Sequence, residues 1–120
     1  MRKQCHNPYM PLWEHVPDGE PHVFGDRLYV FGSHDLENGN EFCEQDYVCW
    51  SAPVKDLSDW RCDGVIYKKE QDPYNQDALP LYAPDVVKGP DGRYYLYYCI
   101  KFQDSINVAV CDTPAGEYRF

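Results

Sequence analysis

The sequence predicts an all-β fold made of β-propeller blades, and three observations support this fold class. Helical periodicity is hard to find along the 120 residues, whereas short runs of β-branched and aromatic residues alternate with turn signals from end to end. The pattern of runs occurs twice along the chain, as an internal repeat with a period of about sixty residues. Each unit reads as one four-stranded antiparallel sheet, and successive sheets of this kind are the blades of β-propellers.

The first unit contains four predicted strands. Residues 21–24 and 28–33 flank a turn in which Gly25 and Asp26 favour a tight hairpin. The third strand is predicted over residues 46–52, and a shorter fourth strand lies around residues 60–67.

The second unit repeats this order, with predicted strands over residues 84–87, 93–100, 106–112 and 117–120. The motif "GDRLYVF" of the first unit aligns with "DGRYYLY" of the second. Eight strands would also suffice for a β-sandwich. The repeat favours the propeller, although two blades cannot close a ring.

The length of the chain indicates one domain over residues 1–120. Within it we expect a first blade over residues 17–67, an inter-blade loop over residues 68–82 and a second blade over residues 83–120. Asn75 and Gln76 of the loop are candidates to reach a substrate.

The charge balance limits the partners. The chain has 20 Asp and Glu against 11 Lys and Arg, a net charge of −9, which repels nucleic acid and anionic lipid. No apolar run approaches membrane-spanning length. We therefore expect no nucleic acid and no membrane partner. The 11 tyrosines suit sheet packing and also stacking against sugar rings.

The six cysteines, Cys5, Cys43, Cys49, Cys62, Cys99 and Cys111, are expected to be free thiols. The N-terminal residues lack the apolar segment of a secretory signal, so a cytoplasmic protein is expected. No C-x-x-C, D-x-D-x-D-G or paired-His spacing occurs, so we expect neither a metal nor a cofactor.

Each unit begins with an acid beside a proline. Glu20 precedes Pro21, and Asp85 follows Pro84; proline is tolerated at the first residue of a strand. The first strand of a blade usually lines the axial tunnel, so both carboxylates would face one axis. Glycosidic cleavage needs a carboxylate base, an acid and often a third carboxylate. An acid at the start of a strand is just as often a solvated turn residue. The spacing alone therefore leaves open whether Glu20 and Asp85 are catalytic carboxylates or turn residues.

Four segments carry a resemblance to a known family: "NPYMPLW", "GEPHVFGDRLYVFGSHD", "WSAPVKDLSDW" and "LYAPDVVKGPDGRYYLYY". The chain resembles the N-terminal part of glycoside hydrolase family 43, five-bladed propeller enzymes that act on arabinofuranosides, xylosides and related sugars. The resemblance implies a partial five-bladed propeller that, when complete, hydrolyses α-L-arabinofuranosyl or β-D-xylosyl linkages with inversion in plant-type oligo- or polysaccharides.

The resemblance also implies roles. Glu20 falls where the general base stands, and Asp85 falls where a pKa-modulating, substrate-orienting aspartate stands. Because the base is ordinarily Asp, Asp18 is a competing candidate, but its place ahead of the strand favours Glu20 and makes Asp18 a turn residue. The resemblance places the general acid, a Glu, on the third blade. It has no counterpart here, because Glu117 falls in an outer-strand position of the second blade. The chain alone is expected to be nearly inactive.

Further residues are candidates for a sugar pocket. Trp13 precedes the first strand as a stacking platform, and His34 and Asp35 follow the second strand. The alternative for Asp35 is a turn in which it accepts backbone N–H groups. His22 either faces the tunnel or is a packed, hydrogen-bonded histidine.

A second function class is a non-catalytic carbohydrate-binding or assembly module. Its exposed blade faces would pair with another copy or with a chain that carries the remaining blades.

Overall fold

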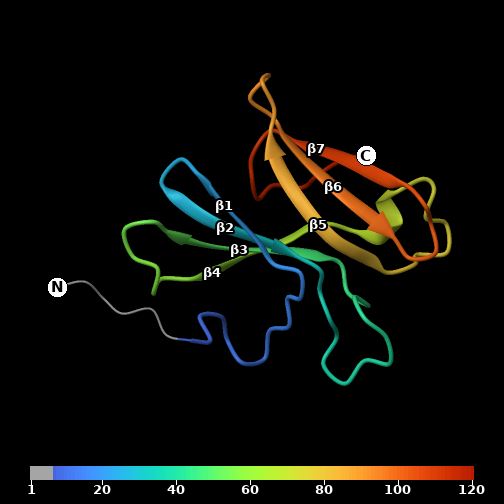
Figure 1. Ribbon diagram of the computed structural model, residues 1–120, viewed down its shortest axis with the longest axis horizontal. Helices are drawn as coiled ribbons and strands as arrows, with labels where there is room; N and C mark the ends of the chain where they lie inside the picture. The colour runs from blue at the N-terminus through green and yellow to red at the C-terminus, as the bar shows by residue number, and fades with distance from the viewer. Residues whose placement is uncertain (1–6) are drawn as a thin grey trace.

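A computed structural model describes residues 7–120 as two antiparallel β-sheets, and no helix in this range is long and apolar enough to cross a membrane. The first sheet has the strand order β1 (Glu20–Phe24), β2 (Arg27–Gly32), β3 (Tyr47–Pro53) and β4 (Arg61–Tyr67). The second has the order β5 (Leu81–Lys88), β6 (Tyr94–Ile100) and β7 (Ile106–Cys111). Figure 1 shows the two sheets as separate layers, joined by a link that contains the 3-10 turn η1 (Lys69–Gln71). The all-β prediction is confirmed.

The second sheet has three strands, so the prediction of a fourth strand over residues 117–120 is wrong. In this segment Arg119 forms only an isolated bridge with Val110. The preceding N–H of Tyr118 donates to the Ile66 carbonyl at 2.8 Å, which belongs to the first sheet. The segment therefore divides its backbone hydrogen bonds between the two sheets instead of extending the second.

The predicted hairpin between the first two strands is present. Phe24 pairs with Arg27, which leaves Gly25 and Asp26 as the connecting loop. Gly25 has φ +63°, in the left-handed region that glycine adopts without steric cost. The hairpin fixes the register of β1, the strand that carries Glu20 and His22.

One hydrophobic core fills the space between the sheets. Along β6 the side chains alternate between buried and partly or fully exposed positions, as a sheet with one covered face requires. Aromatic rings meet across the interface, with centroids 5.0 Å apart for both Phe24–Tyr94 and Tyr67–Tyr98. This packing holds the two sheets together as neighbouring blades.

A buried carboxylate anchors the link between the sheets. Asp72 accepts the Tyr98 hydroxyl at 2.5 Å, the Tyr74 N–H at 2.7 Å and the Asn107 side-chain amide at 3.2 Å. The Tyr67 hydroxyl lies 2.8 Å from that of Tyr98, so the network joins both sheets.

Asn75, a residue of the same link, is also buried and does not point toward solvent. Its side chain bonds to the carbonyls of Lys69 and Leu79 and to the Leu79 N–H. Asn75 therefore stabilises the loop, and the expectation that it reaches a substrate is wrong. Gln76 is exposed.

The second sheet leaves its outer face uncovered. We call this surface the open face; it consists of the exposed apolar side chains of β5, β6 and β7, namely Val87, Tyr97, Ile106 and Val108. On this face Tyr97 pairs directly with Val108 on one side and with Asp85 on the other, so the apolar side chains adjoin an exposed carboxylate.

Candidate active site

Acids from the two sheets meet where β1 and β5 run close together. Glu20 and His22 are alternate residues of β1 and therefore point to the same side of the strand. The Nε2 atom of His22 lies 2.6 Å from Oδ1 of Asp85, which belongs to β5. One ligand atom of each of these three residues lies within 4.8 Å of the others. The structure thus brings the predicted pair, Glu20 and Asp85, together.

His22 has a polar partner across the blade boundary, as well as aromatic neighbours. Its ring stacks on Phe24, with centroids 5.7 Å apart. Asp85 accepts the Val86 N–H at 2.8 Å through the same Oδ1 that faces His22. Its side chain is 58% exposed, and no hydrogen bond to its second oxygen is present among the described residues. Asp85 therefore presents a fixed, accessible carboxylate oxygen.

The same three residues are the ones in the described part of the chain that could hold a metal ion. Two carboxylates and an imidazole form a donor set that suits a divalent transition metal. Sequence spacing missed the group because its members come from two blades.

Asp18 also lies at a concave surface. It lines a hollow of about 460 Å³ together with Pro17, Phe42, Cys43 and Tyr82. Its φ is +55°, a conformation that Asp tolerates better than most residues and that is common at functional sites. Asp18 does lie in a bend, but the interpretation of it as only a turn residue is incomplete, and Glu20 does not line this hollow.

A glycine lets the segment that carries Asp18 approach β2. A Cβ added to Gly32 would overlap the Val16 side chain and lie 2.8 Å from the Pro17 carbonyl oxygen. The residue after this contact, Ser33, donates its hydroxyl to Oδ2 of Asp18 at 3.1 Å.

Cys43 lines the hollow as a neutral thiol. Burial raises the pKa of the Cys43 thiol above its ordinary value, which disfavours the thiolate needed for nucleophilic chemistry. The described cysteines Cys43, Cys49, Cys62, Cys99 and Cys111 are unpaired, and Cys5 lies outside the described residues.

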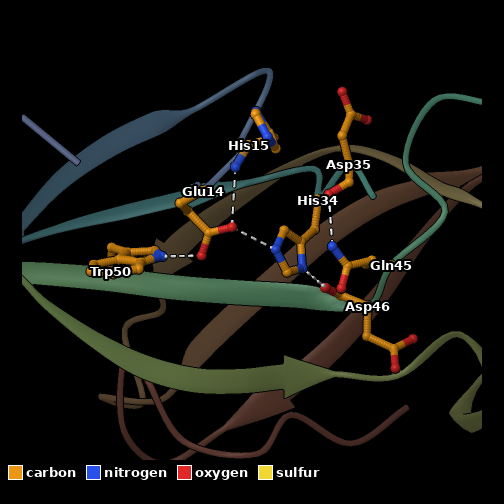
Figure 2. A network of polar contacts seen from close by, with 7 residues as sticks. All are labelled: Glu14, His15, His34, Asp35, Gln45, Asp46 and Trp50. Atoms are coloured by element: carbon orange, nitrogen blue, oxygen red, sulfur yellow. Dashed lines mark hydrogen bonds and ion pairs between the residues drawn. The ribbon is translucent and has the colours of Figure 1, made fainter. Parts of the chain in front are cut away.

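His34 is enclosed in a polar network and does not line the hollow. Figure 2 shows the Glu14 carboxylate between the Trp50 indole and the His34 imidazole. His34 Nε2 is 2.7 Å from Glu14 Oε1, and its Nδ1 is 3.0 Å from the Asp46 carbonyl. The His34 side chain is 12% exposed and that of Glu14 is 6% exposed. Both ring nitrogens therefore have polar partners within the protein, and the role of His34 in substrate binding stays a prediction.

Asp35 accepts a backbone N–H group in a turn, which is the structural alternative to sugar binding. Its Oδ1 accepts the Cys43 N–H at 2.7 Å, and its carbonyl accepts the Gln45 side-chain amide at 2.7 Å. Asp35 therefore holds the loop that places Cys43 and Phe42 at the hollow.

Trp13 remains available as a stacking surface. Its side chain is an exposed large hydrophobic group, 63% accessible, and its ring centroid lies 5.9 Å from that of buried Trp50. Trp50 is held by the bond to Glu14. The network supports an aromatic surface, and Glu14 is a residue that sequence reasoning missed because no motif marks it.

Neighbouring antiparallel sheets are the units of a β-propeller, and carboxylates that meet between two such units are the groups that glycoside hydrolases use. The model of the glycosyl hydrolases family 43 matches residues 15–120, and the chain belongs to this family. Its two sheets are two blades of that propeller.

Individual relatives agree with this assignment. A xylosidase/arabinosidase of Thermoclostridium stercorarium is 63% identical over 121 residues, which cover 100% of this chain and 26% of the relative. Xylosidase/arabinosidase 43A of Humicola insolens is 33% identical over 90% of this chain and 36% of its own length. The crystal structure of a GH43_1 enzyme from Xanthomonas citri with xylose matches with a TM-score of 0.75 at 28% identity, over 92% of this chain and 33% of that one. The chain thus spans about a quarter to a third of these relatives.

Proposed function

We propose that this chain supplies two blades of a glycoside hydrolase that cleaves α-L-arabinofuranosyl or β-D-xylosyl linkages with inversion. One observation carries the proposal: a carboxylate lines a hollow of about 460 Å³, and two further carboxylates meet where the first strands of the two blades run close together. Relatives named xylosidase/arabinosidase support this choice of substrates.

Asp18 is the general base in this proposal. It is the carboxylate that lines the hollow, where a water molecule and a sugar ring have room to meet it. The base removes a proton from the water as the water attacks the anomeric carbon. Glu20, which the family resemblance favours, is the alternative base, and it lies with His22 and Asp85.

Asp85 orients the substrate. Its Oδ1 is held by His22 and by the Val86 N–H, which leaves the second oxygen to accept a sugar hydroxyl. A carboxylate held in this way loses little side-chain freedom when substrate binds, which favours correct placement of the ring. Exposed Trp13 offers a stacking surface for a sugar.

The general acid comes from outside residues 1–120 in this account. Inverting enzymes place acid and base roughly 6.5–9.5 Å apart, whereas Glu20 and Asp85 lie within 4.8 Å of each other and of His22. If Glu20 is the base, Asp85 is therefore too close to serve as its acid; for either base, the family resemblance puts the acid on a further blade.

The test is a graft. Residues 1–120 replace the matched 121 residues of the Thermoclostridium relative, and hydrolysis of p-nitrophenyl arabinofuranoside and p-nitrophenyl xyloside is measured. The proposal predicts activity in the graft and almost none in the 120-residue chain alone. An inactive, folded graft would contradict it.

The open face favours a second candidate, an assembly module. The face exposes Val87, Tyr97, Ile106 and Val108, and uncovered apolar surfaces of this kind mark association sites. We propose that a second copy, or a chain that carries further blades, covers it. Sedimentation of the 120-residue chain tests this, because a monomer at all concentrations would contradict self-association.

A further inference from the structure

We propose that Ser33 positions the Asp18 carboxylate by linking it to the second blade. This inference rests on the proposed function, in which Asp18 is the general base. Ser33 follows the last residue of β2 and is fully buried. Its hydroxyl has two strong polar partners, one on each blade.

The direction of both hydrogen bonds follows from the chemistry of the groups. The Ala83 N–H is 2.8 Å from Ser33 Oγ and can only donate, so the Ser33 oxygen accepts this bond. The single hydroxyl hydrogen of Ser33 is then free to bond to Oδ2 of Asp18 at 3.1 Å. The Cys43 thiol also contacts Ser33, but sulfur is a much weaker acceptor than a carboxylate.

The N–H of Ala83 is available because the second sheet is irregular at this point. The register between β5 and β6 shifts between Tyr82 and Asp85, and Ala83 has φ +39°. A bulge leaves its extra residue unpaired in the ladder, and here the freed N–H bonds to Ser33 on the other blade. Bulges are common next to active sites, where they redirect a side chain.

The link joins the two segments that form the site. On one side, Ser33 holds Asp18, whose backbone has the strained φ of +55°. On the other side, Ala83 lies between Tyr82, which lines the hollow, and the strand position of Asp85. One hydroxyl therefore sets the position of the first-blade carboxylate relative to the second-blade segment.

Ser51 provides a matched control. It is another fully buried serine of the same sheet, and its hydroxyl accepts from the Arg27 guanidinium at 3.0 and 3.2 Å. Its partners do not include Asp18 or Ala83. Ser51→Ala removes the same atom at the same degree of burial and leaves the link intact.

The first readout is spectroscopic and uses the 120-residue chain. Ser33→Ala is expected to move the Ala83 amide proton resonance upfield and to shift the Asp18 carboxyl carbon resonance, whereas Ser51→Ala moves neither. Asp18→Gly suits the positive φ and removes the acceptor, so it should also shift the Ala83 amide through the altered Ser33 hydroxyl. An Ala83 amide that does not respond to Asp18→Gly overturns the link, even if Ser33→Ala fails to fold.

The second readout is kinetic and uses the graft described above. A small displacement of a catalytic group lowers the reaction rate more than it weakens substrate binding. Ser33→Ala should therefore lower kcat about 30–100-fold and leave KM within about threefold of the parent value. Ser51→Ala should leave both near those of the parent graft. Equal losses in the two variants would overturn a positioning role. An inactive parent graft would count against the proposed function, and the resonance shifts would then decide the link alone.

Discussion

The network around Glu14 makes a sharp prediction about stability. Glu14 accepts the Trp50 indole N–H at 2.8 Å and the His15 backbone N–H at 3.1 Å, and its Oε1 lies 2.7 Å from His34 Nε2. The other His34 nitrogen faces the Asp46 carbonyl. Because a carbonyl oxygen can only accept, Nδ1 of His34 carries the hydrogen of this bond.

The substitution Glu14→Gln keeps the shape and replaces one acceptor oxygen by an NH₂ group. With the amide oxygen toward the Trp50 N–H, the NH₂ group faces His34 Nε2, so this ring nitrogen loses its carboxylate partner. A hydrogen bond to a charged group contributes about 1.5–3 kcal/mol, and an unsatisfied buried donor costs more. We expect a loss of about 2–4 kcal/mol, a large share of the ~5–15 kcal/mol stability of a typical domain.

The assay is urea unfolding of the 120-residue chain followed by tryptophan fluorescence, which compares midpoints at unchanged m-value. Glu41→Gln is the matched control, because Glu41 pairs with Lys101 at 2.6 Å on the surface, where its side chain is 53% exposed. This control should leave the midpoint close to that of the unmodified chain. Equal midpoints for the two variants would refute the reasoning about the buried network.

Three further predictions follow from the packing. Asp72→Asn replaces the buried acceptor of Tyr98 and Asn107 and should cost about 1–3 kcal/mol in the same urea assay; an unchanged midpoint would contradict this. Burial raises the pKa of Tyr67 to about 12. Below about pH 10 the tyrosine of the unfolded chain is neutral, and the contribution of Tyr67 to the free energy of unfolding is complete. This contribution is lost as the pH rises through the pKa of Tyr67 in the folded chain. Urea midpoints that stay constant between pH 8 and 12 would contradict the prediction that burial raises the pKa of Tyr67. Tyr97→Lys on the open face should reduce self-association in sedimentation, whereas Glu37→Lys on the exposed loop of the first blade should not.

Most strands could be predicted from the sequence because each one is a short run rich in β-branched and aromatic residues between clear turn signals. β6 was predicted within one residue, since "YYLYYCI" is aromatic and β-branched and follows a glycine turn. The C-terminal "EYRF" has the same local character. It does not form a strand because its backbone hydrogen bonds go to two different sheets. The local sequence pattern does not predict such a division.

The candidate site was only partly predictable. The proximity of Glu20 and Asp85 could be predicted because each lies beside a proline in the first strand of its unit. The contact between His34 and Glu14 could not be predicted, because the two residues are 20 positions apart and Glu14 belongs to no motif. Ser33 and Ala83 are 50 residues apart, and their contact depends on a bulge and on the packing of two blades.

The measurement that tests the account most directly is kcat of the graft with Asp18→Asn and, separately, with Glu20→Gln. A general base contributes about 10²–10⁴-fold to rate. The account predicts a loss of that size for Asp18→Asn and a loss below about tenfold for Glu20→Gln. The reverse order, with Asp18→Asn nearly as active as the parent graft, would contradict the assignment of the hollow as the reaction site.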